Sequence, residues 1–305
     1  MPLAPRKPAG AAPTIGAVPA PPAAYRARPI GVFDSGVGGL TVLHELLVRL
    51  PHEDYVYLAD SARLPYGERR PDELRAFALE VAEELLERGI KLLVVACNSA
   101  TAAALPVLQE RLMETTLGVE ALGVVQPAAV QAVAATRRGR VGVLGTPATV
   151  ATGAYATAIA ATDPFVEVVS VSCGDLAMRI EAGTIDDALV SAVRGYCAPL
   201  REAGVDTVIL GCTHYPLVKP ILQRMLGPDV AIITSGAPLA RQVEHVLGTR
   251  GLDRPGDREG SYGFLCTGDT ATFRQQGTRF LQLPLGPVEH VTLGAALERL
   301  VGSPA

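Results

Sequence analysis

The chain has 305 residues, enough for about two domains that each bury a core of their own. Hydrophobic residues make up 49% of it and charged residues 19%, a balance that excludes wholesale disorder. The formal net charge of -4 is too small a bias for a dedicated nucleic-acid surface, and the apolar runs are far shorter than the ~20 residues that a membrane span needs.

Residues 1–28 are rich in Pro and Ala, and we expect them to form a flexible tail outside the fold. Proline interrupts every stretch of this segment that could serve as the apolar core of a signal peptide. The five cysteines are an odd number scattered along a long chain, which favours free thiols over a disulfide framework. We therefore expect a cytoplasmic protein.

From residue 29 onward, short runs rich in Val, Ile and Leu alternate with helical patterns. This alternation predicts an α/β protein whose parallel strands are covered by helices. The expected strands are 30–33, 55–59, 92–96, 121–125, 141–144, 166–171, 207–211 and 231–234.

The segments that follow the first two strands carry polar side chains. The turn 34–41 resembles a phosphate loop, but it lacks a Gly-Lys-Ser/Thr sequence, and Asp34 would repel a phosphate. Asp34 and Ser35 instead suit an ammonium group, or could orient a proton carrier. In the segment 60–67, Tyr66 and Gly67 could shape a pocket, although Pro-Tyr-Gly is also an ordinary turn.

Two cysteines stand at equivalent places in an internal repeat. Residues 30–35 recur as 141–146, 55–59 as 165–169, and 85–97 as 200–212. This alignment matches Cys97 with Cys212, and each directly follows a buried strand, where open α/β sheets place their ligand crevice. The duplication predicts two pseudo-symmetric doubly wound domains, formed by 29–121 with 235–305 and by 122–234, with the active site in the cleft between them.

The two cysteines have different neighbours. Cys97 precedes a helix start, which tends to lower the pKa of a thiol. His214 lies two residues after Cys212, and imidazole suits a proton relay near neutral pH. A single cysteine is more often a small buried apolar residue, but two at matching strand ends indicate chemistry. We expect structural thiols at the other three, Cys173, Cys197 and Cys266, with Cys173 near the cleft.

The second half offers further polar groups and no metal motif. Hydroxyls in the segment 145–149 replace the carboxylate of Asp34 and suit a substrate carboxylate at a helix start. Glu181 is a candidate acid near Cys212, or a solvated residue on a helix face. No pair of cysteines has the spacing of a zinc site, so we predict no metal.

Four motifs in order, at 34–39, 65–67, 97–100 and 211–216, resemble the signatures of the glutamate racemases within the aspartate/glutamate racemase family. The resemblance extends over about residues 29–300. It implies a cofactor-independent enzyme that interconverts L-glutamate and D-glutamate by two-base proton transfer, and that supplies D-glutamate for peptidoglycan and hence for cell-wall biogenesis and cell shape. A homodimer is possible, with no nucleic-acid or membrane partner.

The resemblance also implies roles for individual residues. The implied catalytic residues are Cys97, Cys212, Asp34, His214 and Glu181. The implied substrate contacts are Asp34, Ser35, Tyr66, Gly67, Asn98, Ser99, Thr213 and His214. Cys97 would serve the D-enantiomer with help from Asp34, and Cys212 the L-enantiomer with help from His214 and Glu181. Ser99 and Gly174 depart from the usual Thr and Pro, whereas His214 favours glutamate over aspartate.

Two other functions fit part of these features. In a Cys-His hydrolase or acyltransferase, Cys212 would be the nucleophile and His214 the base, but Cys97 would then have no task. A bilobed module could also bind an amino acid without any catalysis.

Overall fold

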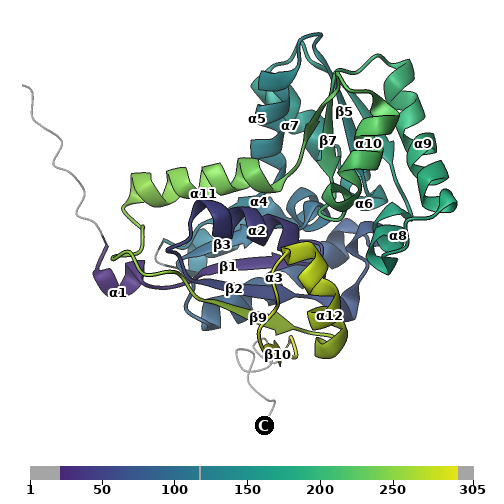
Figure 1. Ribbon diagram of the computed structural model, residues 1–305. Coiled ribbons are helices and arrows are strands. Elements are labelled where there is room, and N and C mark those ends of the chain that lie inside the picture. Colours follow the sequence, from purple (N-terminus) through teal and green to yellow (C-terminus); the bar gives the residue numbers. More distant parts are fainter. Residues whose placement is uncertain (1–20, 117, 295–305) are drawn as a thin grey trace, which may run out of the picture.

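The computed structural model describes residues 21–116 and 118–294, and it contains two parallel β-sheets that lie in separate parts of the molecule (Figure 1). We call the six-stranded sheet and the helices packed on it the larger unit, and the four-stranded sheet with its helices the smaller unit. Every strand pair in both sheets is parallel. The predicted α/β class with mainly parallel sheets is therefore confirmed.

In the larger unit, the strand order is β10-β9-β2-β1-β3-β4. Its strands are β1 (Ile30–Asp34), β2 (Tyr55–Ala59), β3 (Leu92–Val95), β4 (Ala121–Gly123), β9 (Tyr262–Cys266) and β10 (Val288–His290). Its helices are α1 (Ala23–Arg26), α2 (Leu40–Arg49), α3 (Pro71–Glu87), α4 (Asn98–Thr115), α11 (Gly236–Arg250) and α12 (Thr270–Leu281), with short 3-10 turns at Ser61–Arg63 and Tyr66–Glu68. Apolar residues of α2, α11 and α12 cover one face of the sheet, and those of α3 and α4 cover the other.

In the smaller unit, the strand order is β6-β5-β7-β8. Its strands are β5 (Arg140–Gly145), β6 (Glu167–Ser172), β7 (Thr207–Gly211) and β8 (Ala231–Ile233). Its helices are α5 (Val125–Ala135), α6 (Pro147–Ala151), α7 (Ala154–Thr162), α8 (Leu176–Ala182), α9 (Asp187–Glu202) and α10 (Lys219–Leu226), and a 3-10 turn spans Tyr215–Val218. The helices α5 and α7 cover one face, and α8, α9 and α10 cover the other.

The internal repeat has a direct counterpart in the two sheets. The order β2-β1-β3-β4 of the larger sheet matches β6-β5-β7-β8 of the smaller one. Cys97 follows β3, and Cys212 follows β7, which takes the same place in its own sheet. Parallel strands end at one edge of their sheet, so each cysteine is delivered to the carboxyl edge of its unit.

The eight predicted strands all occur, and two of them, 55–59 and 207–211, have the predicted bounds. The strands β9 and β10 were not predicted. Only three residues form β10, and the first two residues of β9 are exposed, so neither run has the apolar density of a buried strand. Pairing of β9 with β2 extends the larger sheet at that edge.

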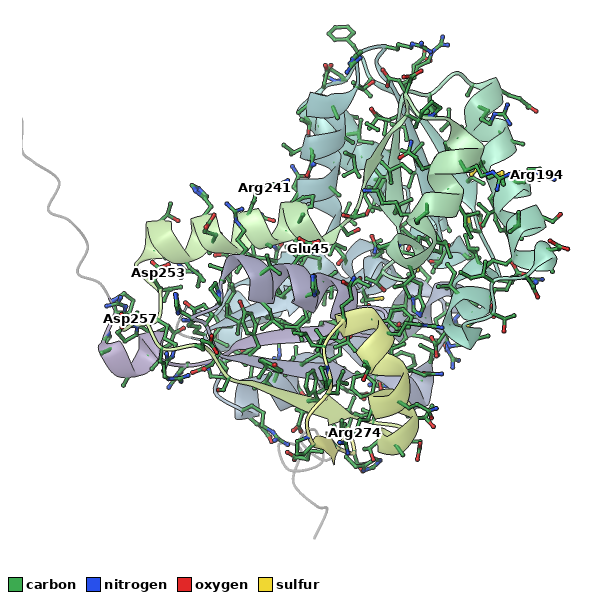
Figure 2. The ribbon with its side chains drawn as sticks, in the orientation of Figure 1. Glu45, Arg194, Arg241, Asp253, Asp257 and Arg274 are labelled. Atoms are coloured by element: carbon green, nitrogen blue, oxygen red, sulfur yellow. The ribbon has the colours of Figure 1, made fainter. Side chains whose placement is uncertain are left out.

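The chain crosses between the units twice. After β4 it enters α5 of the smaller unit, and after β8 it returns through α11, which lies along α2 (Figure 1). Figure 2 shows Arg241 on α11 and Glu45 on α2, and Arg241 donates to Gln131 of α5. The division into 29–121 with 235–305 and 122–234 stays a prediction, and β4 extends the larger sheet to Gly123.

The flexible tail was predicted to extend to residue 28, but part of its C-terminal end is helical. Residues 1–20 lie outside the described residues, but Ala23–Arg26 form α1. The fully buried Lys91 donates its ammonium hydrogens to the backbone oxygen of Arg26 at 2.7 Å and to Glu53 at 2.5 Å. The hydrogen bond to Arg26 ties α1, at the start of the described chain, to the residue that precedes β3 of the larger sheet. In the parts of the chain that the structure describes, none of the helices has the length and apolar character that crossing a bilayer requires.

Candidate active site

A cavity lies between the carboxyl edges of the two sheets. Its lining comes from both units: Ser35, Leu64, Pro65, Tyr66, Gly67, Glu68, Cys97, Asn98, Ser99, Thr146, Gly174, Ala177, Met178, Cys212, Thr213 and His214. Cys97 and Cys212 thus face the same space, with 5% and 7% of their surfaces exposed. Seven of the eight implied substrate contacts line this cavity, and Asp34 does not.

Cys97 caps the N-terminus of α4 and is surrounded by groups of the larger unit. Its sulfur lies 4.0 Å from the hydroxyl oxygen of Ser35. Burial raises the pKa of the Cys97 thiol, and the nearby carboxylate of Asp34 raises it further. The sequence predicted a lowered pKa from the helix start, whereas in the structure the loss of solvation at the buried sulfur outweighs the helix dipole.

Cys212 has a basic neighbour instead. The Nδ1 atom of His214 lies 3.8 Å from its sulfur, and the Nε2 atom of His214 lies 2.9 Å from Oε2 of Glu181. Burial lowers the pKa of His214, but its hydrogen bonds to Cys212 and Glu181 more than offset this effect and raise the pKa to about 10. The raised pKa favours an imidazolium beside the second sulfur at neutral pH.

The fully buried Asp34 lies behind the cavity wall and bridges the two units. Its Oδ1 atom accepts a hydrogen bond from the backbone of Gly36 at 3.0 Å, and its Oδ2 atom accepts one from the hydroxyl of Thr213 at 3.2 Å. Burial raises the pKa of Asp34, although the charge of His214 and the hydrogen bonds to Gly36 and Thr213 lower it. Asp34 therefore contacts the lining residue Thr213 without lining the cavity itself.

Hydroxyl groups from both units also meet beside the cavity. The Ser99 hydroxyl lies 2.9 Å from that of Thr146 and 3.2 Å from that of Thr149. Thr146 also caps α6, where its side chain accepts from the backbone of Thr149. The segment 145–149, which the sequence associated with a carboxylate, thus meets the motif that follows Cys97.

Three contributors were missed or undervalued in the sequence. Asp60 is fully buried and accepts from the phenol of Tyr66, and also from Arg63 at 2.6 Å. Its position directly after β2, comparable to that of Asp34 at the end of β1, was the available signal. Tyr155 and Ser235 both lie against Asn98, and no motif in the sequence marks either of them.

Glu181 contributes to the raised pKa of His214, and replacing it tests this pairing. We expect the Glu181→Gln variant to lower the pKa of His214 by at least about 1, because a neutral amide no longer stabilises the imidazolium. Proton NMR titration of the imidazole, assigned with a His214→Asn variant, would measure the change. The other histidines serve as internal controls, and an unchanged pKa of His214 would contradict the pairing.

The same shift links His214 to folding stability. The pKa is raised in the folded state, so its stabilising contribution is fully present below the unfolded value of about 6.5. That contribution is lost as the pH rises through about 10.

Within the two described ranges, no group of three or more His, Cys, Asp or Glu side chains is placed to hold a metal ion.

Comparison with known proteins identifies relatives of similar length. The sequence model of the Asp/Glu/hydantoin racemase family matches residues 38–243. The chain is 44% identical to the glutamate racemase of Geobacter metallireducens over 272 residues, which cover 89% of this chain and 99% of the relative. It is also 44% identical to the glutamate racemase of Listeria monocytogenes over 266 residues, 87% of this chain and 98% of the relative.

Solved structures of similar proteins have the same fold. A glutamate racemase from Bacillus anthracis superposes with a TM-score of 0.82 at 37% identity, covering 87% of this chain and 97% of the other. A glutamate racemase from Francisella tularensis in complex with D-glutamate has a TM-score of 0.81 at 32% identity, covering 88% and 99% of the two chains.

Proposed function

Since this chain belongs to the Asp/Glu/hydantoin racemase family, we propose that its cleft exchanges a proton at the α-carbon of glutamate between Cys97 and Cys212. The enzyme is an isomerase that interconverts L-glutamate and D-glutamate. One observation carries the mechanism: two thiols from equivalent strand ends of related sheets line a single cavity. A substrate whose enantiomers differ in the face that carries hydrogen suits such a pair.

The reaction needs a base on one face of the α-carbon and an acid on the other. A thiolate removes the α-proton, so that the C–H bond breaks and an S–H bond forms. The electron pair left on carbon then takes a proton from the opposite thiol, whose S–H bond breaks as the new C–H bond forms. The net result is an inverted stereocentre and exchanged thiol and thiolate states. Proton exchange with solvent resets the pair, and no cofactor takes part.

The two sulfurs take different roles because their surroundings differ. The imidazolium of His214 stands beside Cys212, which supports Cys212 as the base for L-glutamate. Burial keeps Cys97 a thiol, which supports Cys97 as the proton donor in that direction and the base for D-glutamate after the states exchange. Asp34 assists Cys97 through Ser35, and Glu181 assists Cys212 through His214.

The cavity wall supplies the groups that bind the substrate and stabilise the developing carbanion. The lining residues that we assign to contact with the substrate are Ser35, Gly67, Asn98, Ser99, Thr213 and His214. The phenol of Tyr66 already donates to Asp60, so Tyr66 contributes its ring and its backbone. Enclosure by both units excludes water and strengthens each of these electrostatic interactions.

The setting of the reaction is part of the proposal. The relatives are glutamate racemases of bacteria, so we assign the D-glutamate produced here to peptidoglycan synthesis. The described chain includes all five cysteines as free thiols, which supports a reducing, cytoplasmic location. A homodimer stays a prediction.

Incubation of the purified protein in deuterated water with each enantiomer of glutamate and of aspartate, without added cofactor, tests the function. We expect glutamate to reach a racemic mixture with deuterium at the α-carbon, and aspartate to react far more slowly. Chiral chromatography with mass spectrometry measures both. A protein that binds glutamate without incorporating deuterium would be the non-catalytic module, and the proposal would fail.

A further inference from the structure

Among the described residues, only the oxygen atom of the Asn98 side-chain amide has hydrogen-bond partners. Asn98 is the first residue of α4, lines the cavity and is 2% exposed. Its Oδ1 atom accepts a hydrogen bond from the phenol of Tyr155 at 2.6 Å, and the hydroxyl of Ser235 lies 3.3 Å away. The amide oxygen is therefore turned toward Tyr155 and away from the cavity.

The amide nitrogen of Asn98, unlike the oxygen, is an unpaired donor among the described residues. Its Nδ2 atom is buried and has no hydrogen-bond partner among the described residues. An unpaired buried donor is costly, so native structures rarely keep one without a ligand or water to receive it. Because Asn98 lines the cavity that contains both sulfurs, this donor is available to an anionic oxygen bound there.

Tyr155 belongs to the other unit. It is part of α7, and its ring is buried in the core of the smaller unit, whereas Asn98 starts a helix of the larger one. Burial raises the pKa of the Tyr155 phenol, so the hydroxyl remains neutral and carries the proton that it donates to Asn98. Ser235 precedes α11, where the chain returns to the larger unit, and its single hydroxyl hydrogen is shared between Oδ1 of Asn98 at 3.3 Å and the backbone oxygen of Leu210 at 3.2 Å. The oxygen of Asn98 is thus fixed by groups outside its own helix.

We propose that Tyr155 is a positioning residue, whose hydroxyl fixes the amide of Asn98 so that Nδ2 donates to a carboxylate oxygen of the substrate. The inference rests on the proposed function for the identity of that carboxylate. It also couples binding to domain arrangement, because the bond between Tyr155 and Asn98 forms only while the two units are together. Without the phenol hydroxyl, only the shared hydrogen of Ser235 holds the amide oxygen, so the amide presents its oxygen to the carboxylate part of the time.

A Tyr155→Phe variant removes the hydroxyl and keeps the ring in the core. We expect the KM for both enantiomers of glutamate to rise about tenfold, with kcat changed less than about threefold, because one charge-assisted hydrogen bond to bound substrate is weakened. The matched control is Tyr196→Phe, whose phenol contacts Asp175 on the surface of the same unit, and its kinetics should equal those of the parent. Equal KM values for Tyr155→Phe and the parent would overturn the proposal.

A double-mutant cycle separates positioning from a structural role. If Tyr155 acts through Asn98, adding Tyr155→Phe to an Asn98→Ala variant should raise the KM by less than about twofold. A further tenfold increase would show an independent effect and overturn the inference. Calorimetric titration with glutamate measures the change in Kd that Tyr155→Phe causes, and this measurement does not require racemisation. A failure of the proposed function can therefore be distinguished from a failure of this inference. A melting temperature for each variant reports whether it folds.

Discussion

Serine in place of either Cys97 or Cys212 should lower kcat for racemisation by about 10³ in both directions. A hydroxyl is a far weaker acid than a thiol, so it supplies neither the thiolate that takes the α-proton nor the acid that returns it. Each direction uses one sulfur as base and the other as donor. Loss of either one therefore stops L-to-D and D-to-L conversion alike, while the KM for glutamate changes little.

The two single variants should differ in the half-reaction that they keep. Cys97→Ser retains Cys212 beside the imidazolium of His214, so it should still exchange the α-hydrogen of L-glutamate with solvent and leave D-glutamate unlabelled. Cys212→Ser should show the opposite preference. Mass spectrometry of each enantiomer recovered from deuterated water measures this, and equal labelling of both enantiomers by one variant would contradict the assignment.

The same kinetic assay tests a control variant and the alternative of a Cys-His hydrolase. Cys197 is buried in the core of the smaller unit and does not line the cavity, so Cys197→Ser should keep the parental kcat. In a Cys-His hydrolase, Cys97→Ser would keep nearly full activity because Cys212 and His214 suffice as nucleophile and base. If Cys97→Ser kept more than about a tenth of the parental inversion rate, the two-base mechanism would be contradicted.

The position of both thiols could be predicted from the sequence because it depends on a local rule. A buried strand delivers the residue after it to the carboxyl edge of a parallel sheet, and the internal repeat showed that two such residues were equivalent. Glu181 was a candidate acid from the sequence alone, but preferring that role to a solvated position needed the family resemblance, since a glutamate in α8 has no local feature that shows which side chain it meets. In the structure that partner is His214.

Other features depend on contacts between distant parts of the chain. Burial of Cys97 reverses the shift in pKa that its helix start predicts, and burial is set by the whole fold. The strand β9 is fixed by pairing with β2, which is far away in sequence. The phenol of Tyr155 meets Asn98 across two units, so neither helix pattern nor strand alternation could identify it.

A methyl group at Gly38 should disable the cleft while leaving both cores intact. A Cβ atom there would lie 2.4 Å from the hydroxyl oxygen of Thr213 and 2.5 Å from Nδ1 of His214, closer than real Cβ atoms come to any neighbour. Those two side chains are short, buried and held by Asp34 and Glu181. The strain is therefore relieved by moving the turn after β1 away from the motif that contains Cys212.

Such a displacement separates the two halves of the proton-transfer site. We expect kcat/KM of Gly38→Ala to fall about 10²-fold in both directions, because a shift of roughly 1 Å at the reacting groups costs about this much. Gly195→Ala is the matched control, since a Cβ at that helical position meets nothing within 4 Å. Parental kinetics in Gly38→Ala, with an unchanged pKa of His214, would mean that the close approach of the units is not required. A loss of activity with an unchanged melting temperature would instead show that catalysis depends on the glycine that lets one unit reach the sulfur of the other.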